Sequence, residues 1–322
     1  MTSKQLQLAE GEKAGCSDKG INVRSSNVGC MYFDITMPLT LFAVTLVALF
    51  ANQKTEGKLK ENLLQDRQMG VWDAALLVGV MSVMIFLVVF VREISYALMV
   101  LYMFAYSMLL FTFTYLFSKN RWYLGILPPA VFILLYVFLG VLRDDPLWTL
   151  YLANVFGLVF AVLITLYLVG LFTWKTTAIF GVLITVMDII LVLVTRTMVE
   201  AAKVAVGLRL PVMVSLPLIP PAAGLGVSMM SLGLGDFFFA GLLGVQTFKK
   251  YGKQFAIVCA AAMTVSFFIF ETLLLNFWRI PFAGTLMIIC GWAPLVIWKQ
   301  LTVRKATVSE LEAPAVGQMT SG

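Results

Sequence analysis

The sequence contains no histidine. A zinc protease of the HExxH type needs two histidine ligands, and a serine–histidine dyad needs histidine as its base. Both routes to peptide hydrolysis are therefore closed. Any acid–base chemistry in this chain must come from carboxylates, lysine, tyrosine or cysteine.

Cysteine is scarce, and its spacing is uninformative. The four residues Cys16, Cys30, Cys259 and Cys290 form no CxxC or other paired pattern. We therefore predict neither a metal site nor a disulfide framework. The sequence also shows no cofactor motif, and we expect no cofactor.

Charged residues are few: they make up 12% of the chain, whereas an ordinary soluble domain is about a quarter charged. Apolar residues make up 61%, and the mean hydropathy is +0.94. Apolar runs near 20 residues long, bounded by charge, are typical of membrane helices. The sequence thus predicts an all-α polytopic membrane protein. Its net charge of +6 resides in loops and tails, so it indicates membrane orientation and not nucleic-acid binding.

We predict nine membrane-spanning helices in this chain. Their approximate bounds are residues 31–51, 71–91, 95–117, 122–141, 147–170, 177–195, 231–248, 255–276 and 281–299. Residues 1–30 and 300–322 are polar and resemble disordered tails. The spans divide into an N-terminal bundle, residues 31–170, and a second half, residues 171–299. Basic residues in the connections slightly favour an external N-terminus and a cytoplasmic C-terminus.

The longest connection, residues 196–230, contains four prolines, which prevent a regular helix through it. Residues 212–216, between two of these prolines, are rich in β-branched and apolar side chains. They fit a short exposed strand. A re-entrant or interfacial loop fits equally well, and the sequence leaves both open.

The carboxylates differ in their predicted depth. Those at span ends are expected to be solvated or interfacial: Asp34, Asp73, Glu93, Asp144 and Asp145. Glu271 lies inside the eighth span, and we expect it to snorkel or to pair with Arg279. Asp188 and Asp236 lie deeper, where a charge costs about 2.5–3.5 kcal/mol. This cost makes both of them functional candidates.

Asp188 and Asp236 are predicted at matching depths. The end of the sixth span and the start of the seventh are joined by one connection, so both carboxylates lie about 8–10 Å below the same membrane face. Two carboxylates in contact cannot both ionise cheaply, so such a pair shares a proton. One member can then activate water while the other polarises a peptide carbonyl. The alternatives are a structural pair joining two helices and a cation site in an ion-coupled transporter.

The residues around these aspartates resemble a known family. Gly233 to Asp236, "GLGD", match the GxGD motif of the presenilin and signal peptide peptidase family of intramembrane aspartyl proteases. Asp188 stands where that family has its first catalytic aspartate, with Met187 in place of the usual tyrosine. "ANVFG", residues 153–157, resembles the family's Asn-x-x-Gly element, and "IPFAGTL" aligns with its Pro-Ala-Leu motif. The compact connection makes the chain most similar to archaeal presenilin homologues.

The resemblance implies a nine-helix, presenilin-like fold and a catalytic pair formed by Asp188 and Asp236. It places substrate contacts at Gly233, Leu234, Gly235, Pro281, Phe282 and Ala283, with only the proline of the Pro-Ala-Leu motif retained in place. The implied substrates are transmembrane segments or signal-peptide remnants, and the implied location is a prokaryotic cell membrane. A prepilin peptidase of GxGD type fits less well, because no segment resembles that family's polar cytoplasmic region.

Overall fold

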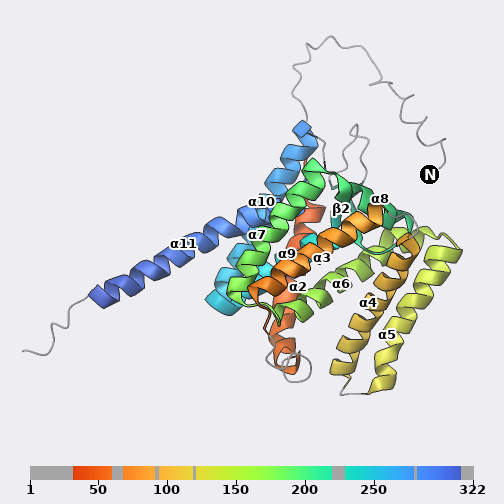
Figure 1. Ribbon diagram of the computed structural model, residues 1–322, viewed down its shortest axis with the longest axis horizontal. Coiled ribbons are helices and arrows are strands. Elements are labelled where there is room, and N and C mark those ends of the chain that lie inside the picture. Colours follow the sequence, from red (N-terminus) through yellow and green to blue (C-terminus); the bar gives the residue numbers. More distant parts are fainter. Residues whose placement is uncertain are drawn as a thin grey trace, which may run out of the picture. The chain divides into compact units, whose positions relative to one another are not determined.

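The computed structural model describes residues 32–59, 68–90, 94–118, 121–219, 229–278 and 281–312 (Figure 1). The α-helices are α2 (Thr36–Leu59), α3 (Val71–Phe90), α4 (Ile94–Phe117), α5 (Trp122–Leu135), α6 (Ala153–Val169), α7 (Trp174–Ile189), α8 (Thr197–Gly207), α9 (Leu234–Tyr251), α10 (Lys253–Leu273) and α11 (Gly284–Glu312). Four π-helical segments adjoin them: η2 (Tyr136–Leu142), η3 (Trp148–Leu152), η4 (Ile190–Val194) and η5 (Leu274–Trp278). The strands are β1 (Met213–Pro217) and β2 (Met229–Gly233).

The chain has the architecture of a helical polytopic membrane protein. Within the described residues, eight helices are long and apolar enough to cross a membrane. They are Thr36–Gly57, Val71–Phe90, Met99–Phe117, Trp122–Leu142, Trp148–Val169, Trp174–Val194, Lys253–Trp278 and Gly284–Arg304. All eight fall on predicted spans, which confirms the helical membrane class.

The helix at the predicted seventh span is not long and apolar enough to count among these eight. Residues 231–233 belong to β2, so α9 begins only at Leu234. Its 18 residues include Asp236, Lys249 and Lys250, and α9 is not among the eight candidate spans. Nine membrane spans therefore remain a prediction.

The four prolines were expected to prevent a regular helix through residues 196–230, and the helix found there, α8, ends at Gly207, before the first of them. One other predicted boundary differs from the structure. The last helix was expected to end at residue 299, and α11 instead continues to Glu312. The predicted tail at 1–30 lies outside the described residues, as does the end of the chain from residue 313.

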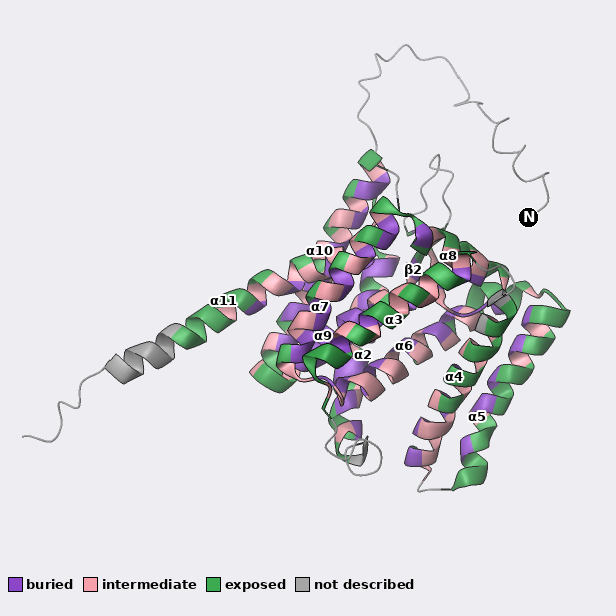
Figure 2. Cartoon of the chain, in the orientation of Figure 1, coloured by how far each residue is buried: buried purple, intermediate pink, exposed green. Residues whose placement is uncertain are grey.

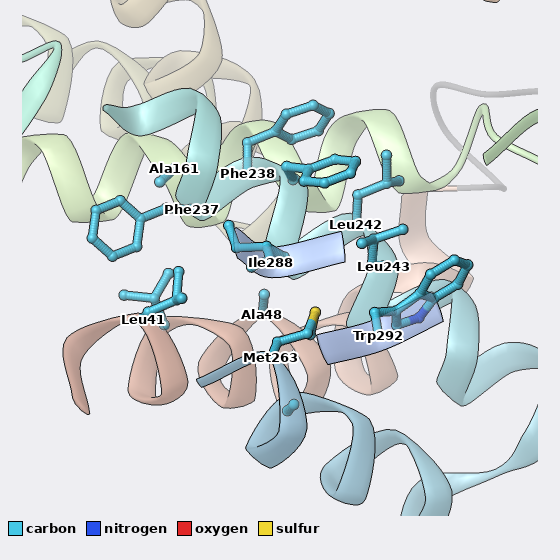
Figure 3. Packing of buried hydrophobic residues seen from close by; sticks show 14 of the residues in the cluster. Leu41, Ala48, Ala161, Phe237, Phe238, Leu242, Leu243, Met263, Ile288 and Trp292 are labelled. Atoms are coloured by element: carbon cyan, nitrogen blue, oxygen red, sulfur yellow. The ribbon is translucent and has the colours of Figure 1, made fainter. Parts of the chain in front are cut away.

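α9 forms the centre of the main core, and every residue from Phe237 to Thr247 is buried (Figure 2). Figure 3 shows Phe237, Phe238, Leu242 and Leu243 of this helix surrounded by side chains of its neighbours. Those neighbours are Leu41 and Ala48 of α2, Ala161 of α6, Met263 of α10, and Ile288 and Trp292 of α11. A helix buried on all sides can carry polar groups to a protected interior.

Two glycines allow α9 to lie this close to its neighbours. A Cβ added to Gly241 would lie 2.9 Å from Cγ2 of Thr165 on α6. A Cβ added to Gly244 would lie 2.9 Å from Cγ2 of Thr45 on α2. Small residues at these crossings fix the position of α9, and hence of Asp236 in its first turn.

β1 and β2 form an antiparallel pair in which Ser215 lies opposite Ser231 and Met213 opposite Gly233. β1 confirms the strand that was one of the two alternatives for residues 212–216. The segment leading into β1 is held by three aromatic side chains that donate hydrogen bonds to its carbonyls. These bonds are Tyr102 to Pro211 (2.7 Å), Tyr136 to Leu208 (2.8 Å) and Trp148 to Arg209 (3.0 Å).

Candidate active site

Asp188 lies near the end of α7 and is 9% exposed. The hydroxyl group of Thr285 donates a hydrogen bond of 2.6 Å to Oδ2 of this aspartate. Thr285 is itself buried in the first turn of α11. The carboxyl group of Asp188 therefore has a fixed orientation toward the start of α11.

Asp236 lies in the first turn of α9 and is half-buried. A carboxylate is favoured there because the unpaired backbone N–H groups of a helix start carry partial positive charge. The carboxyl group also lies against Gly284 on α11. A Cβ added to Gly284 would lie only 2.6 Å from Oδ1 of Asp236. No side chain larger than hydrogen fits at residue 284 unless Asp236 moves.

The two aspartates thus meet consecutive residues at the start of α11. Asp188 is bonded to Thr285, and Asp236 lies against Gly284. Both carboxyl groups are therefore placed at the same turn of α11. The sequence-based expectation that these two residues, on two different helices, lie together agrees with this geometry.

The predicted Pro281, Phe282 and Ala283 lead into this turn but do not make these contacts. Pro281 is exposed, and Ala283 is fully buried. The ring of Phe282 stacks on Phe270 of α10, with 6.1 Å between the centroids. The contacts to the aspartates come from the next two residues, which the sequence analysis did not name. The signal for them was a Gly-Thr pair at the start of an otherwise apolar helix.

The glycines of the GLGD motif leave space beside Asp236. A Cβ added to Gly235 would meet nothing within 4 Å, and one added to Gly233 would lie 3.4 Å from Oδ2 of Asp236. Leu234 differs from both, because its side chain is buried against Gly157 of α6. Gly233 and Gly235 therefore fit the expected approach route to Asp236, while Leu234 packs in the core.

One edge of the strand pair is closed by a side chain. The side-chain amide of Asn154, on α6, donates a hydrogen bond of 2.7 Å to the carbonyl of Ser215. It also accepts a hydrogen bond of 2.8 Å from the backbone N–H of Ser215. Asn154 thereby occupies the place that a neighbouring strand would take beside β1. The ANVFG segment singled out by sequence supports the strands in a second way, because Gly157 lies against Pro211 and Val214.

The other edge of the pair belongs to β2. Because Ser215 directs its backbone groups to Asn154, the Ser215–Ser231 pair is a non-hydrogen-bonded one, and Ser231 directs its own groups away from β1. The bond from Leu234 N–H to the carbonyl of Val212 agrees with this alternation. Within the described residues the sheet has two strands only. β2 therefore presents an open edge that leads directly to Asp236.

Comparison with known proteins adds no family assignment: no protein-family model and no curated protein sequence matches this chain.

Proposed function

We propose that this chain is an intramembrane aspartyl protease that hydrolyses peptide bonds in transmembrane segments or signal-peptide remnants. The observation that carries the proposal is the convergence of Asp188 and Asp236 on residues 284 and 285. Each carboxyl group is presented by a different helix, and the space beside Asp236 is lined by glycine. A structural pair would have no need of such an opening.

The chemistry proposed for this pair needs neither metal nor histidine. One carboxyl group is ionised and takes a proton from water, while the other is protonated and donates to the carbonyl oxygen of the peptide bond. Water adds to the carbonyl carbon, and the resulting tetrahedral intermediate then expels the amine. The carboxyl that received the proton delivers it to the departing nitrogen, and the other carboxylate takes back a proton from a hydroxyl of the intermediate as the carbonyl re-forms. Thr285 holds Asp188 in position through this exchange.

The substrate would reach the pair in extended form. A helical segment hides its peptide groups in its own hydrogen bonds, so it must unwind before water can attack. The open edge of β2 can accept such a strand through main-chain hydrogen bonds at Ser231. The alternative edge, on β1, is occupied at Ser215 by Asn154, which favours β2 as the receiving strand.

The resemblance to presenilin and signal peptide peptidase supports the same proposal. It implies α9 as a ninth membrane helix and a prokaryotic, archaeal membrane as the setting, and the basic residues in the connections favour an external N-terminus. Residues 237–247 of α9 are enclosed by neighbouring helices, and this enclosure offsets the cost of placing Asp236 in a membrane segment. We include these features in the proposed function.

The test is cleavage of a helical model substrate by the purified full chain in detergent. Asp188→Asn and Asp236→Asn should each abolish cleavage, with a loss on the order of 10³-fold or more, because each removes one half of the proton exchange. A hydroxyl-containing mimic of the tetrahedral intermediate should inhibit the unmodified protein.

The matched control is Glu56→Gln, a carboxyl-to-amide change at a residue that pairs with Lys249 at 3.1 Å. This variant should cleave at an unchanged rate. Aspartate-dependent cation uptake into liposomes, without any cleavage, would instead identify an ion-coupled transporter and overturn the protease proposal.

A further inference from the structure

A second pair of buried carboxyl groups includes neither candidate catalytic residue. Asp34, just before α2, is 0% exposed, and Glu271, near the end of α10, is 1% exposed. The sequence predicted a solvated or interfacial Asp34 and a Glu271 that snorkels or pairs with Arg279, and the burial of both residues excludes a solvated Asp34 and a snorkelling Glu271. The partner suggested for Glu271, Arg279, lies outside the described residues.

Asp34 has the surroundings of a carboxylate anion. Its Oδ1 accepts hydrogen bonds from the backbone N–H of Thr36 (3.0 Å), the hydroxyl of Thr36 (2.6 Å) and the backbone N–H of Ile219 (3.2 Å). Its Oδ2 accepts from the backbone N–H of Met37 at 3.2 Å. These donors and the positive end of α2 favour a negative charge at Asp34.

Glu271 has none of these partners. Both of its carboxyl oxygens are buried, and neither makes a hydrogen bond to the described residues. Glu271 lies beside Asp34, because Phe33 contacts Phe268, one turn before Glu271, with 6.4 Å between the ring centroids, and Tyr32 is hydrogen-bonded to Asn276. An ionised, unpaired carboxylate in this position would cost several kcal/mol. A protonated carboxyl group avoids that cost and gains an O–H donor.

We propose that Asp34 and Glu271 form a proton-binding site, in which Glu271 carries the proton beside the Asp34 carboxylate. The inference does not depend on the proposed protease activity. It assigns to Glu271 the role of a buried acid that neutralises the site, a role that an ionised Glu271 could not fill.

The proposed site holds the end of β1 in place. The N–H of Ile35 donates to the carbonyl of Ile219 at 3.1 Å, and the N–H of Ile219 donates to Asp34, while the hydroxyl oxygen of Thr36 lies 2.9 Å from the carbonyl oxygen of Pro217. From the α10 side, the amide of Asn276 pairs with both backbone groups of Tyr32, at 2.9 and 2.6 Å. The carboxyl pair therefore lies where the start of α2, the end of β1 and the end of α10 are joined.

Loss of the proton would place two like charges in this junction. Glu271 is the titratable group on the α10 side and Asp34 the one on the α2 side, and both are buried. Repulsion between two buried like charges would make the folded chain less stable.

Infrared spectroscopy of the full chain in detergent tests the assignment directly. The protonated carboxyl band should be recorded in the Asp188→Asn/Asp236→Asn background, so that the candidate catalytic groups do not contribute. We expect one such band at neutral pH, its loss in Glu271→Gln, and its retention in the control Glu56→Gln. The midpoint temperature of thermal unfolding should fall with rising pH in the background protein. The dependence of this midpoint on pH should be weaker in Glu271→Gln.

Asp34→Asn provides a second variant in case Glu271→Gln does not fold. It removes the neighbouring carboxylate charge, so the Glu271 band should shift toward the position of a free carboxyl group. An unshifted band would overturn the pairing. Two other results would overturn the proton site: absence of a band that depends on Glu271, or stabilisation by added Na⁺ or Ca²⁺ that disappears in Glu271→Gln.

Discussion

The two pairs of carboxyl groups differ mainly in the space around them. One pair is Asp188 and Asp236, and the other is Asp34 and Glu271. Both pairs join carboxyl groups from different parts of the chain, and in both pairs one member is hydrogen-bonded by a threonine hydroxyl. Beside Asp236, however, a Cβ at Gly235 would meet open space. Around Asp34 and Glu271 the protein leaves at most 1% of either residue exposed.

This difference separates carboxyl groups that can react from those that can only hold structure. An accessible pair needs room for a substrate and water, and glycine provides that room without a side chain. A closed pair cannot admit a substrate, so its charges act on the neighbouring backbone. Substitutions at the open pair should therefore change activity more than stability, and substitutions at the closed pair should do the reverse.

Gly284→Ala should have the largest effect on the open pair, Asp188 and Asp236. Its Cβ would lie 2.6 Å from Oδ1 of Asp236 and would displace the carboxyl group. A displacement near 1 Å can cost about 100-fold in rate. Cleavage should fall by about that factor, with a small change in the thermal midpoint. Gly79→Ala, where the added Cβ meets nothing within 4 Å, is the control. Full activity in Gly284→Ala would contradict the described contact.

Asp34→Ala should mainly reduce stability. It removes the cap of α2 and the hydrogen bond from Ile219, for a combined loss of about 2 kcal/mol in the free energy of unfolding. This corresponds to a roughly 30-fold shift in the folding equilibrium. Denaturation followed by circular dichroism measures it, with Asp73→Ala at an exposed cap as the milder control. A stable Asp34→Ala protein that has lost its activity would contradict the expectation that substitutions at this pair change stability more than activity.

Thr285→Val should lower cleavage by about tenfold, because it removes the hydroxyl that orients Asp188 while keeping the side-chain shape. Thr285→Ser retains a hydroxyl and should keep most of the activity. The rates of both variants, measured at saturating substrate, separate loss of orientation from loss of binding. Equal rates for valine and serine would show that the hydrogen bond does not matter for turnover.

Gly235→Ala should have the smallest effect, a few-fold rise in KM. The added methyl group meets no protein atom within 4 Å, and alanine favours helix over glycine, so stability should be unchanged or slightly higher. Any loss would therefore arise from the substrate. Gly79→Ala again serves as the control. An unchanged KM would place the substrate on another side of Asp236.

The sequence predicted the parts of this molecule whose signal is local. Long apolar runs located the membrane helices, because length and hydrophobicity alone decide whether a helix can cross a bilayer. The β-branched and apolar side chains of residues 212–216, and the prolines on either side of them, suggested β1. Asp188 and Asp236 stood out because a carboxylate in such a setting is costly.

The parts that the sequence did not predict depend on tertiary contacts. β2 has the apolar composition of a helix start, and only its pairing with β1 makes it a strand. Gly284 and Thr285 matter because two distant helices direct carboxyl groups at them. The burial of Glu271 likewise results from the packing around α10, and the residue's position in the sequence suggests only a snorkelling side chain.

The open edge of β2 also has a consequence for hydration. Peptide groups without partners are not tolerated against lipid tails, where each would cost several kcal/mol. The backbone of Ser231 points away from β1, so it must contact water when no other chain pairs with it. Since β2 runs directly into the turn that carries Asp236, this wetted edge brings solvent into the interior of the protein. The strand edge proposed to bind a substrate would thus be hydrated when no substrate is bound.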